Sequence, residues 1–248
     1  MGKDGFVNEK LIIEHLNGKK IGHLNDNMQK FVQYMFKNSL NSTDVIECIK
    51  KAAASKSDII ITSKGIEHSV SIKKGTGNSV HQEPLEYFIN FLNKNFEINE
   101  KIANDLRLFI WGDGTLDGSG SVSERLSAPQ ITKKHPEIVN NIKEFFHVHK
   151  KDLIERFVIK GPKSNSAPDF IYYGDDKKGI WKDSESVLNW LSDDCNESTR
   201  APIPVGRLTF QAWNRNINGG NKSEKKRGVI QLKWGSIGSD LKVIMDSK

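Results

Sequence analysis

Two side chains of opposite charge stand at the ends of neighbouring segments that alternate in the manner of β-strands. Asp58 precedes the apolar run 59–62, Lys73 ends the run 68–73, and the turn Ser63-Lys64-Gly65 lies between them. A hairpin brings its two open ends together, because opposed residues of paired strands lie about 5 Å apart. A carboxylate binds a hard cation through oxygen, and a nearby lysine places positive charge beside a phosphate. This spacing is typical of a Mg²⁺-dependent phosphodiesterase.

The second strand of the predicted hairpin has one polar and one apolar face. Successive side chains of a strand point to opposite sides, so Ser69, Ser71 and Lys73 share one side while Val70 and Ile72 face the core. Ser71 and Lys73 therefore lie on the side that Asp58 reaches. A metal site of this kind needs a second carboxylate.

The hairpin resembles the catalytic hairpin of the PD-(D/E)XK nuclease superfamily, which includes many type II restriction endonucleases. In that family the first acid begins a strand, as in Lys56-Ser57-Asp58, and the (D/E)XK triplet lies on the next strand, as in Ser71-Ile72-Lys73. Ser57 stands where the family has proline and Ser71 where it has the second acid. Some restriction endonucleases with Ser-x-Lys take the missing acid from the following helix.

The resemblance implies a site with Asp58, Ser71 and Lys73, and it covers about 30 residues. Glu83 is the expected second metal ligand, with Glu86 as an alternative on the same predicted helix. A glutamate from an N-terminal helix also serves in some members, for which Glu9, Glu14 and Glu47 are candidates.

The loop of residues 74–83 favours a phosphate partner. Its glycines allow backbone N–H groups to approach an anion, and a helix N-terminus attracts phosphate. Ser79 is a candidate cap for the predicted helix, and Lys74 and Asn78 are candidate DNA contacts beside it. Ordinary turn and capping chemistry explains the same residues equally well.

A second DNA-binding candidate is the segment 207–233, which is polar and basic. Arginine pairs with guanine and Asn or Gln with adenine, while lysine mostly neutralises phosphate. The alternative is a solvated basic loop. The candidate contacts are Arg207, Gln211, Asn214, Arg215, Asn216, Asn218, Lys222, Lys226 and Arg227.

Two other constellations compete with the hairpin. Pro168-Asp169 precedes the run 170–173, and Lys182 follows, with Ile180 where the acid is wanted and Glu185 in the next predicted helix. The stretch from Asp113 to Glu124 is close to a calcium loop, although a glycine-rich DNA-facing loop or a plain connecting loop fits it better.

Composition places limits on the class of protein. The chain has 248 residues, 27% of them charged, and a net charge of +6, which favours a polyanionic partner. No apolar run approaches the roughly 20 residues of a membrane span. Two cysteines cannot form a disulfide framework, and the N-terminus lacks a secretory signal. We expect a cytoplasmic protein with reduced thiols.

Hydrophobic spacing predicts helices that lead and strands that cluster later. Predicted helices cover residues 8–17, 25–38, 42–54, 84–92, 99–111, 136–149 and 186–191. Predicted strands cover 58–73 as a hairpin and then 157–160, 170–173, 207–213 and 229–234. The expected fold class is α/β, a mixed central sheet flanked by helices.

We expect a single nuclease domain over 1–248. Residues 1–97 would hold the N-terminal helices, the catalytic hairpin and its helix, and 98–248 the remaining sheet and the recognition loops. The predicted function is site-specific cleavage of double-stranded DNA with Mg²⁺, and the resemblance implies a homodimer. The alternatives are a non-catalytic DNA-binding protein with a degenerate site, because Ser71 replaces an acid, and a calcium-responsive interaction protein.

Overall fold

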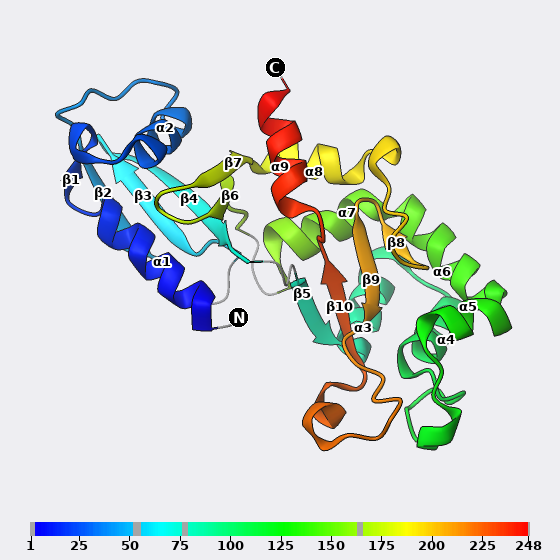
Figure 1. Ribbon diagram of the computed structural model, residues 1–248. Coiled ribbons are helices and arrows are strands. Elements are labelled where there is room, and N and C mark those ends of the chain that lie inside the picture. The colour runs from blue at the N-terminus through cyan, green and yellow to red at the C-terminus, as the bar shows by residue number, and fades with distance from the viewer. Residues whose placement is uncertain (1–2, 52–55, 76–78, 163–165, 248) are drawn as a thin grey trace. The chain divides into compact units, whose positions relative to one another are not determined.

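The chain folds into two compact units, each with its own sheet. The computed structural model describes residues 3–51, 56–75, 79–162 and 166–247 (Figure 1). Unit 1 comprises 1–78, 155–190 and 236–248, and unit 2 comprises 79–154 and 191–235.

Unit 1 is built on a six-stranded sheet in the order β1-β2-β3-β4-β6-β7. Strands β4 and β6 run parallel, and the other neighbours in this sheet run antiparallel. Its strands are β1 (Lys19–Lys20), β2 (Val45–Lys50), β3 (Ile59–Ser63), β4 (Ile66–Lys73), β6 (Phe170–Gly174) and β7 (Gly179–Asp183). Its helical elements are α1 (Lys3–Leu16), η1 (Ile21–His23), α2 (Asp26–Met35), η3 (Glu155–Lys160) and α9 (Ile237–Asp246), together with most of α8 (Ser184–Ser192).

Helices α1 and α2 pack their apolar faces against the six-stranded sheet. Asn25 caps α2 by accepting a hydrogen bond from the Met28 backbone N–H at 2.9 Å. Phe31 on α2 packs on Tyr172 and Trp181, with ring centroids 4.8 and 5.2 Å away. These contacts bury one face of the central strands, so the polar side chains of β4 lie on the other face.

Unit 2 contains a four-stranded sheet in the order β5-β10-β9-β8, with each neighbouring pair antiparallel. Its strands are β5 (Ser79–Pro84), β8 (Pro204–Val205), β9 (Leu208–Ala212) and β10 (Val229–Lys233). Its helical elements are α3 (Leu85–Phe96), α4 (Glu100–Trp111), η2 (Val122–Glu124), α5 (Ala128–Lys134), α6 (Pro136–Val148), α7 (Lys150–Ile154), η4 (Asp194–Asn196) and η5 (Asn221–Lys226).

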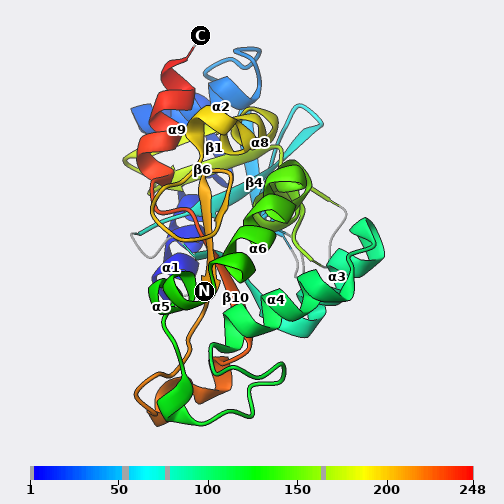
Figure 2. The same ribbon diagram turned by 90° about the vertical axis from the view of Figure 1, so that its right-hand side faces the viewer.

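Helices α3, α4 and α6 lie on one side of this sheet, as the two views in Figures 1 and 2 show. The core between them is aromatic. Phe210 on β9 has its ring centroid 4.9 Å from Phe146, 6.0 Å from Phe88 and 6.1 Å from Phe109. Burial of such large apolar rings fixes which face of β9 points inward.

Three local predictions are wrong. Residues 45–50 form strand β2 and not a helix, because Ile46 and Cys48 are buried in alternation. Residues 79–84 form strand β5 where a loop and a helix start were expected, and α3 begins only at Leu85. Residues 155–160 form a π-helix and not a strand, since their apolar run is buried without a strand partner.

The expected fold class is confirmed, because a mixed sheet is flanked by helices in an α/β arrangement. The hairpin of β3 and β4 is also confirmed, with Ile59 opposite Val70. Within the described ranges, no helix has the length and apolar character needed to cross a membrane.

Candidate functional site

The Asp58 carboxylate lies at the head of β3 and turns onto the neighbouring strand β4. The Asp58 backbone N–H donates to the Val70 carbonyl at 2.8 Å, which extends the ladder by one residue. Its Oδ2 accepts hydrogen bonds from the Ile72 N–H at 2.6 Å and from the Ser71 hydroxyl at 3.3 Å. These bonds fix the orientation of the carboxylate.

Lys73 completes a three-residue cluster with Asp58 and Ser71. Its Nζ donates to the Ser71 Oγ at 2.6 Å and lies 3.6 Å from the Asp58 Oδ2. The Ser71 hydroxyl thus accepts from the lysine and donates to the aspartate. The approach of Asp58 and Lys73 that the spacing predicted is therefore present in unit 1.

The members of the cluster differ in their access to solvent. Ser71 is fully buried, the Asp58 side chain is 7% exposed and the Lys73 side chain 22% exposed. The Ser71 hydroxyl is therefore enclosed between the Asp58 carboxylate and the Lys73 ammonium. Lys73 is the most exposed member of the cluster.

The Oδ1 atom of Asp58 is suited to be a metal ligand. Its Oδ1 accepts no hydrogen bond from the residues that the structure describes, whereas Oδ2 has three polar neighbours. Mg²⁺ is usually held by one or two carboxylates together with substrate phosphates and water. Within the described ranges, no group of three or more His, Cys, Asp or Glu side chains is placed to hold a metal ion.

The three candidate glutamates have separate surroundings. Glu83 lies on strand β5 of unit 2, where its carboxylate and His81 Nε2 are 2.8 Å apart and both side chains are buried. The sequence predicts Glu83 on the following helix, and this placement is wrong because α3 begins only at Leu85. Glu86, on α3, forms a bidentate ion pair with Arg107. Glu9, on α1, is buried with its carboxylate 3.2 Å from the Lys50 Nζ.

The residues of the expected phosphate loop are spread over different contacts. Lys74 donates to the Asn8 side chain at 3.2 Å and is 3.6 Å from the Asp175 carboxylate. Ser79 begins strand β5 and does not cap a helix. Asn78 lies outside the described residues.

Several candidates of the basic segment are used inside unit 2. Arg215 donates to the Phe109 carbonyl at 2.7 Å and stacks over that ring, and its burial lowers the pKa of the guanidinium to about 10. Arg227 forms a buried ion pair with Asp113 at 2.9 Å. Asn216 holds the loop that ends at Gly220. These three side chains brace loops.

The other candidates of this segment lie closer to solvent. Lys226 is exposed, with its Nζ 5.6 Å from the centre of the Trp213 ring. Asn218 is exposed, and Arg207, Gln211 and Asn214 are half-buried. Lys222 belongs to η5.

In the loop of residues 113–124, which resembles a calcium loop in sequence, the first acid, Asp113, makes structural contacts. Asp113 accepts hydrogen bonds from the Thr115 N–H and hydroxyl and pairs with Arg227. Burial opposes ionisation, but these bonds outweigh it and lower the pKa of Asp113. The carboxylate is therefore committed to holding the loop.

The competing hairpin of β6 and β7 does not assemble a similar cluster. Asp169 accepts hydrogen bonds from the Ser69 N–H at 2.7 Å and the Ser69 hydroxyl at 3.0 Å. Lys182 lies opposite Ile171, and no ion pair joins it to Asp169 within the described part of the chain. Glu185 is exposed at the start of α8.

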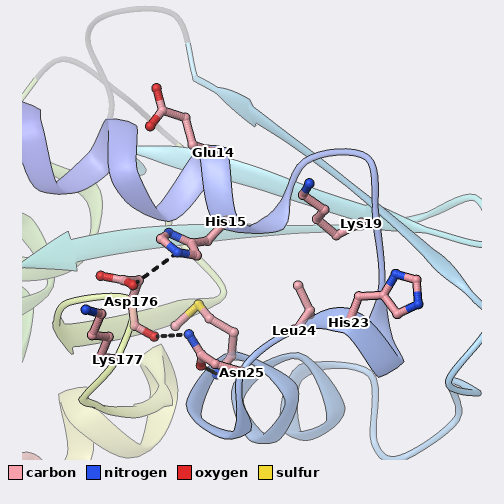
Figure 3. Close-up of a pocket in the computed structure, with 9 residues that line it drawn as sticks. Glu14, His15, Lys19, His23, Leu24, Asn25, Asp176 and Lys177 are labelled. Atoms are coloured by element: carbon pink, nitrogen blue, oxygen red, sulfur yellow. Dashed lines mark hydrogen bonds and ion pairs between the residues drawn. The ribbon is translucent and has the colours of Figure 1, made fainter.

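A cavity of about 640 Å³ lies elsewhere in unit 1, between the end of α1 and the start of α2 (Figure 3). In it the His15 Nε2 is 3.4 Å from the Asp176 carboxylate, and Asn25 donates to the Asp176 carbonyl. Its lining includes none of Asp58, Ser71 and Lys73.

The fold and the hairpin cluster together define the class of structure. No family model matches the chain, and no curated protein matches its sequence. The fold is a restriction-endonuclease-like α/β fold, shown by its similarity to a solved structure.

That solved structure is the restriction endonuclease MspI in complex with its cognate DNA. The similarity has a TM-score of 0.57 at 15% sequence identity and covers 92% of this chain and 88% of MspI. At this identity the similarity establishes the fold.

Proposed function

We propose that the chain is a Mg²⁺-dependent endonuclease that cleaves double-stranded DNA at specific sites, in the manner of a type II restriction endonuclease. The observation that carries this proposal is the cluster of Asp58, Ser71 and Lys73 on the hairpin of a restriction-endonuclease-like fold. The net charge of +6 and the DNA bound to the structural neighbour add support.

In the proposed reaction, water hydrolyses a phosphodiester bond of the duplex. Asp58 would hold Mg²⁺, which would supply a lowered pKa for a bound water and neutralise charge on the phosphate. Lys73 places its ammonium beside the scissile phosphate and stabilises the negative charge that develops there. Ser71 holds the ammonium at 2.6 Å and so limits its motion.

Glu83 stays the predicted second metal ligand, with Glu86 and Glu9 as the alternatives. Glu83 is a buried acid, and each of the three carboxylates has a partner: His81 for Glu83, Arg107 for Glu86 and Lys50 for Glu9. Glu83 is retained first because the resemblance places the second acid after the hairpin. The proposed homodimer rests on the resemblance alone.

Digestion of a DNA of known sequence tests the proposal. With Mg²⁺ we expect discrete fragments, no cutting when EDTA is present, and no cutting by Lys73→Ala. A smear of fragments would indicate a nonspecific nuclease. If the protein cuts DNA with neither Mg²⁺ nor Mn²⁺, the proposal that it is a nuclease is wrong.

A non-catalytic DNA-binding protein is the alternative function, favoured by the serine at position 71. In that case wild type and Lys73→Ala would bind the same DNA sequence and neither would cut it.

A further inference from the structure

A row of glutamines crosses three strands of the unit 2 sheet. Gln231 on β10 lies opposite Gln211 on β9 and opposite Gln82 on β5. The residues that precede and follow them on β9 and β10, such as Phe210 and Leu232, are buried. The glutamines therefore occupy the face of the sheet that points away from the aromatic core.

The central glutamine bonds directly to Gln211 and shares the Ser79 hydroxyl with Gln82. Its Oε1 accepts from the Gln211 Nε2 at 3.0 Å, and its Nε2 donates to the Ser79 hydroxyl at 3.1 Å. The Gln82 Nε2 donates to the same hydroxyl at 3.0 Å. Gln231 is only 7% exposed, whereas Gln211 is half-buried and Gln82 is exposed. The buried Gln231 thus holds Gln211 directly, and it is linked to Gln82 through the shared Ser79 hydroxyl.

The outer glutamines keep hydrogen-bonding capacity for a ligand. An amide has one acceptor oxygen and two N–H donors. Gln82 and Gln211 each use one donor, and neither side-chain oxygen has a bond to the described residues. One acceptor and one donor remain on each, which is the combination that recognises adenine through its N6 and N7 atoms.

The surroundings of the row suit a polyanion. The same face carries Lys233 next to Thr209, and none of the paired positions on this face is acidic. Lys233 has no ion pair with the described carboxylates. Beyond the end of β9, Lys226 lies over the Trp213 ring. Lysines at the rim neutralise phosphate, while amides at the centre read bases.

We propose that this glutamine face reads base edges of duplex DNA, with Gln82 and Gln211 as specificity-determining residues and Gln231 as their positioning residue. The inference rests on the proposed function and deepens it. Gln82 and Gln211 are two strand spacings apart, about 10 Å, which matches about three base-pair steps of about 3.4 Å each. The recognised sequence should therefore contain two adenines, on either strand, separated by about that distance.

Sequencing of the cut ends from a randomised DNA library tests this inference. Wild type should prefer adenine at two positions, and Gln211→Leu should lose that preference at one of them, with kcat/KM at the wild-type site falling about ten- to a hundredfold. Gln211→Glu keeps the shape and the acceptor but loses the donor, so its preference should move towards cytosine. Asn140→Leu, which changes an exposed amide on α6, is the control and should cut as wild type does.

Thermal melting of each variant shows whether it is folded. A shift in preference by the folded Gln211→Glu variant would support base reading, because a purely structural glutamine row cannot change which base is chosen. If wild type cuts specific sites and folded Gln82 and Gln211 variants keep the same preference and rate, the inference is wrong and the proposed function stands. If wild type neither binds nor cuts DNA, both are wrong.

Discussion

Two hairpins of unit 1 share the placement of an aspartate and a lysine, but these residues make different contacts. Both begin with an aspartate and place a lysine on the second strand, yet Lys73 reaches within 3.6 Å of Asp58 while Lys182 has no such contact with Asp169. The difference arises from the neighbouring strand. Asp169 is drawn to Ser69 because β6 runs parallel to β4, whereas Asp58 has its own hairpin partner. Register and neighbours decide which motif becomes a site.

The largest expected difference between the hairpins concerns the aspartates. Asp58→Asn should lower single-turnover cleavage by at least about a thousandfold, because the charge that holds the cation is lost. DNA affinity, measured in Ca²⁺ or EDTA, should change by less than about threefold. Asp169→Asn is the matched control, and its folded fraction should cleave at nearly the wild-type rate. Equal losses in both variants would contradict the assignment.

A second comparison uses the glutamates that would complete each site, Glu83 and Glu185. Glu83→Gln should lower cleavage by about a hundredfold and raise the Mg²⁺ concentration needed for half-maximal rate, because one oxygen ligand loses its charge. Glu185→Gln should have no effect on either. An unchanged metal requirement in Glu83→Gln would transfer the ligand role to Glu86 or Glu9, which the same variants at those positions would decide.

Ser71 should have a smaller effect than the charged residues. Ser71→Ala removes the hydroxyl that holds the lysine, and we expect kcat to fall about tenfold with little change in KM, because orientation rather than binding is lost. Ser69→Ala serves as the control, since Ser69 contacts Asp169 instead. A rise in KM without a fall in kcat would show that Ser71 does not position Lys73.

The smallest expected effect is on the stability of the β6–β7 hairpin and not on cleavage. Asp169→Ala leaves the buried Ser69 N–H without its partner, which should reduce the free energy of unfolding by about 1–3 kcal/mol in urea. Lys182→Ala should cost less than about 0.5 kcal/mol, as is usual for a residue without such a bond. If the two variants are equally stable, the bond to Ser69 does not hold β6 in place.

The sequence predicts the hairpin well because its signals are local. Alternation along β4 and the turn at Gly65, whose φ of +75° suits glycine, define the register that brings Asp58 to Lys73. The burial of Ser71 was not predictable in this way, because it depends on strand β6, about 100 residues further along the chain.

Other parts of the fold depend on partners that are distant in sequence. Strand β5 pairs with β10, nearly 150 residues later, and its polar residues look like a loop until that partner is known. The glutamine row could not be predicted from the sequence for the same reason, because its members become neighbours only when the three strands pair. In the basic segment 207–233 the residue type suggested DNA contacts that the packing does not favour. Arg215 and Arg227 are of a type that binds DNA, but they stack on Phe109 and Trp111.

The most direct test compares Lys73→Ala with Lys182→Ala on a single DNA duplex that wild type cuts. Cleavage under single-turnover conditions with saturating Mg²⁺ should fall at least about a thousandfold in Lys73→Ala and stay within about threefold of wild type in Lys182→Ala. Both variants should bind the duplex with nearly wild-type affinity. Unimpaired cleavage by Lys73→Ala, or loss of cleavage in Lys182→Ala alone, would contradict the assignment of the active site to the β3–β4 hairpin.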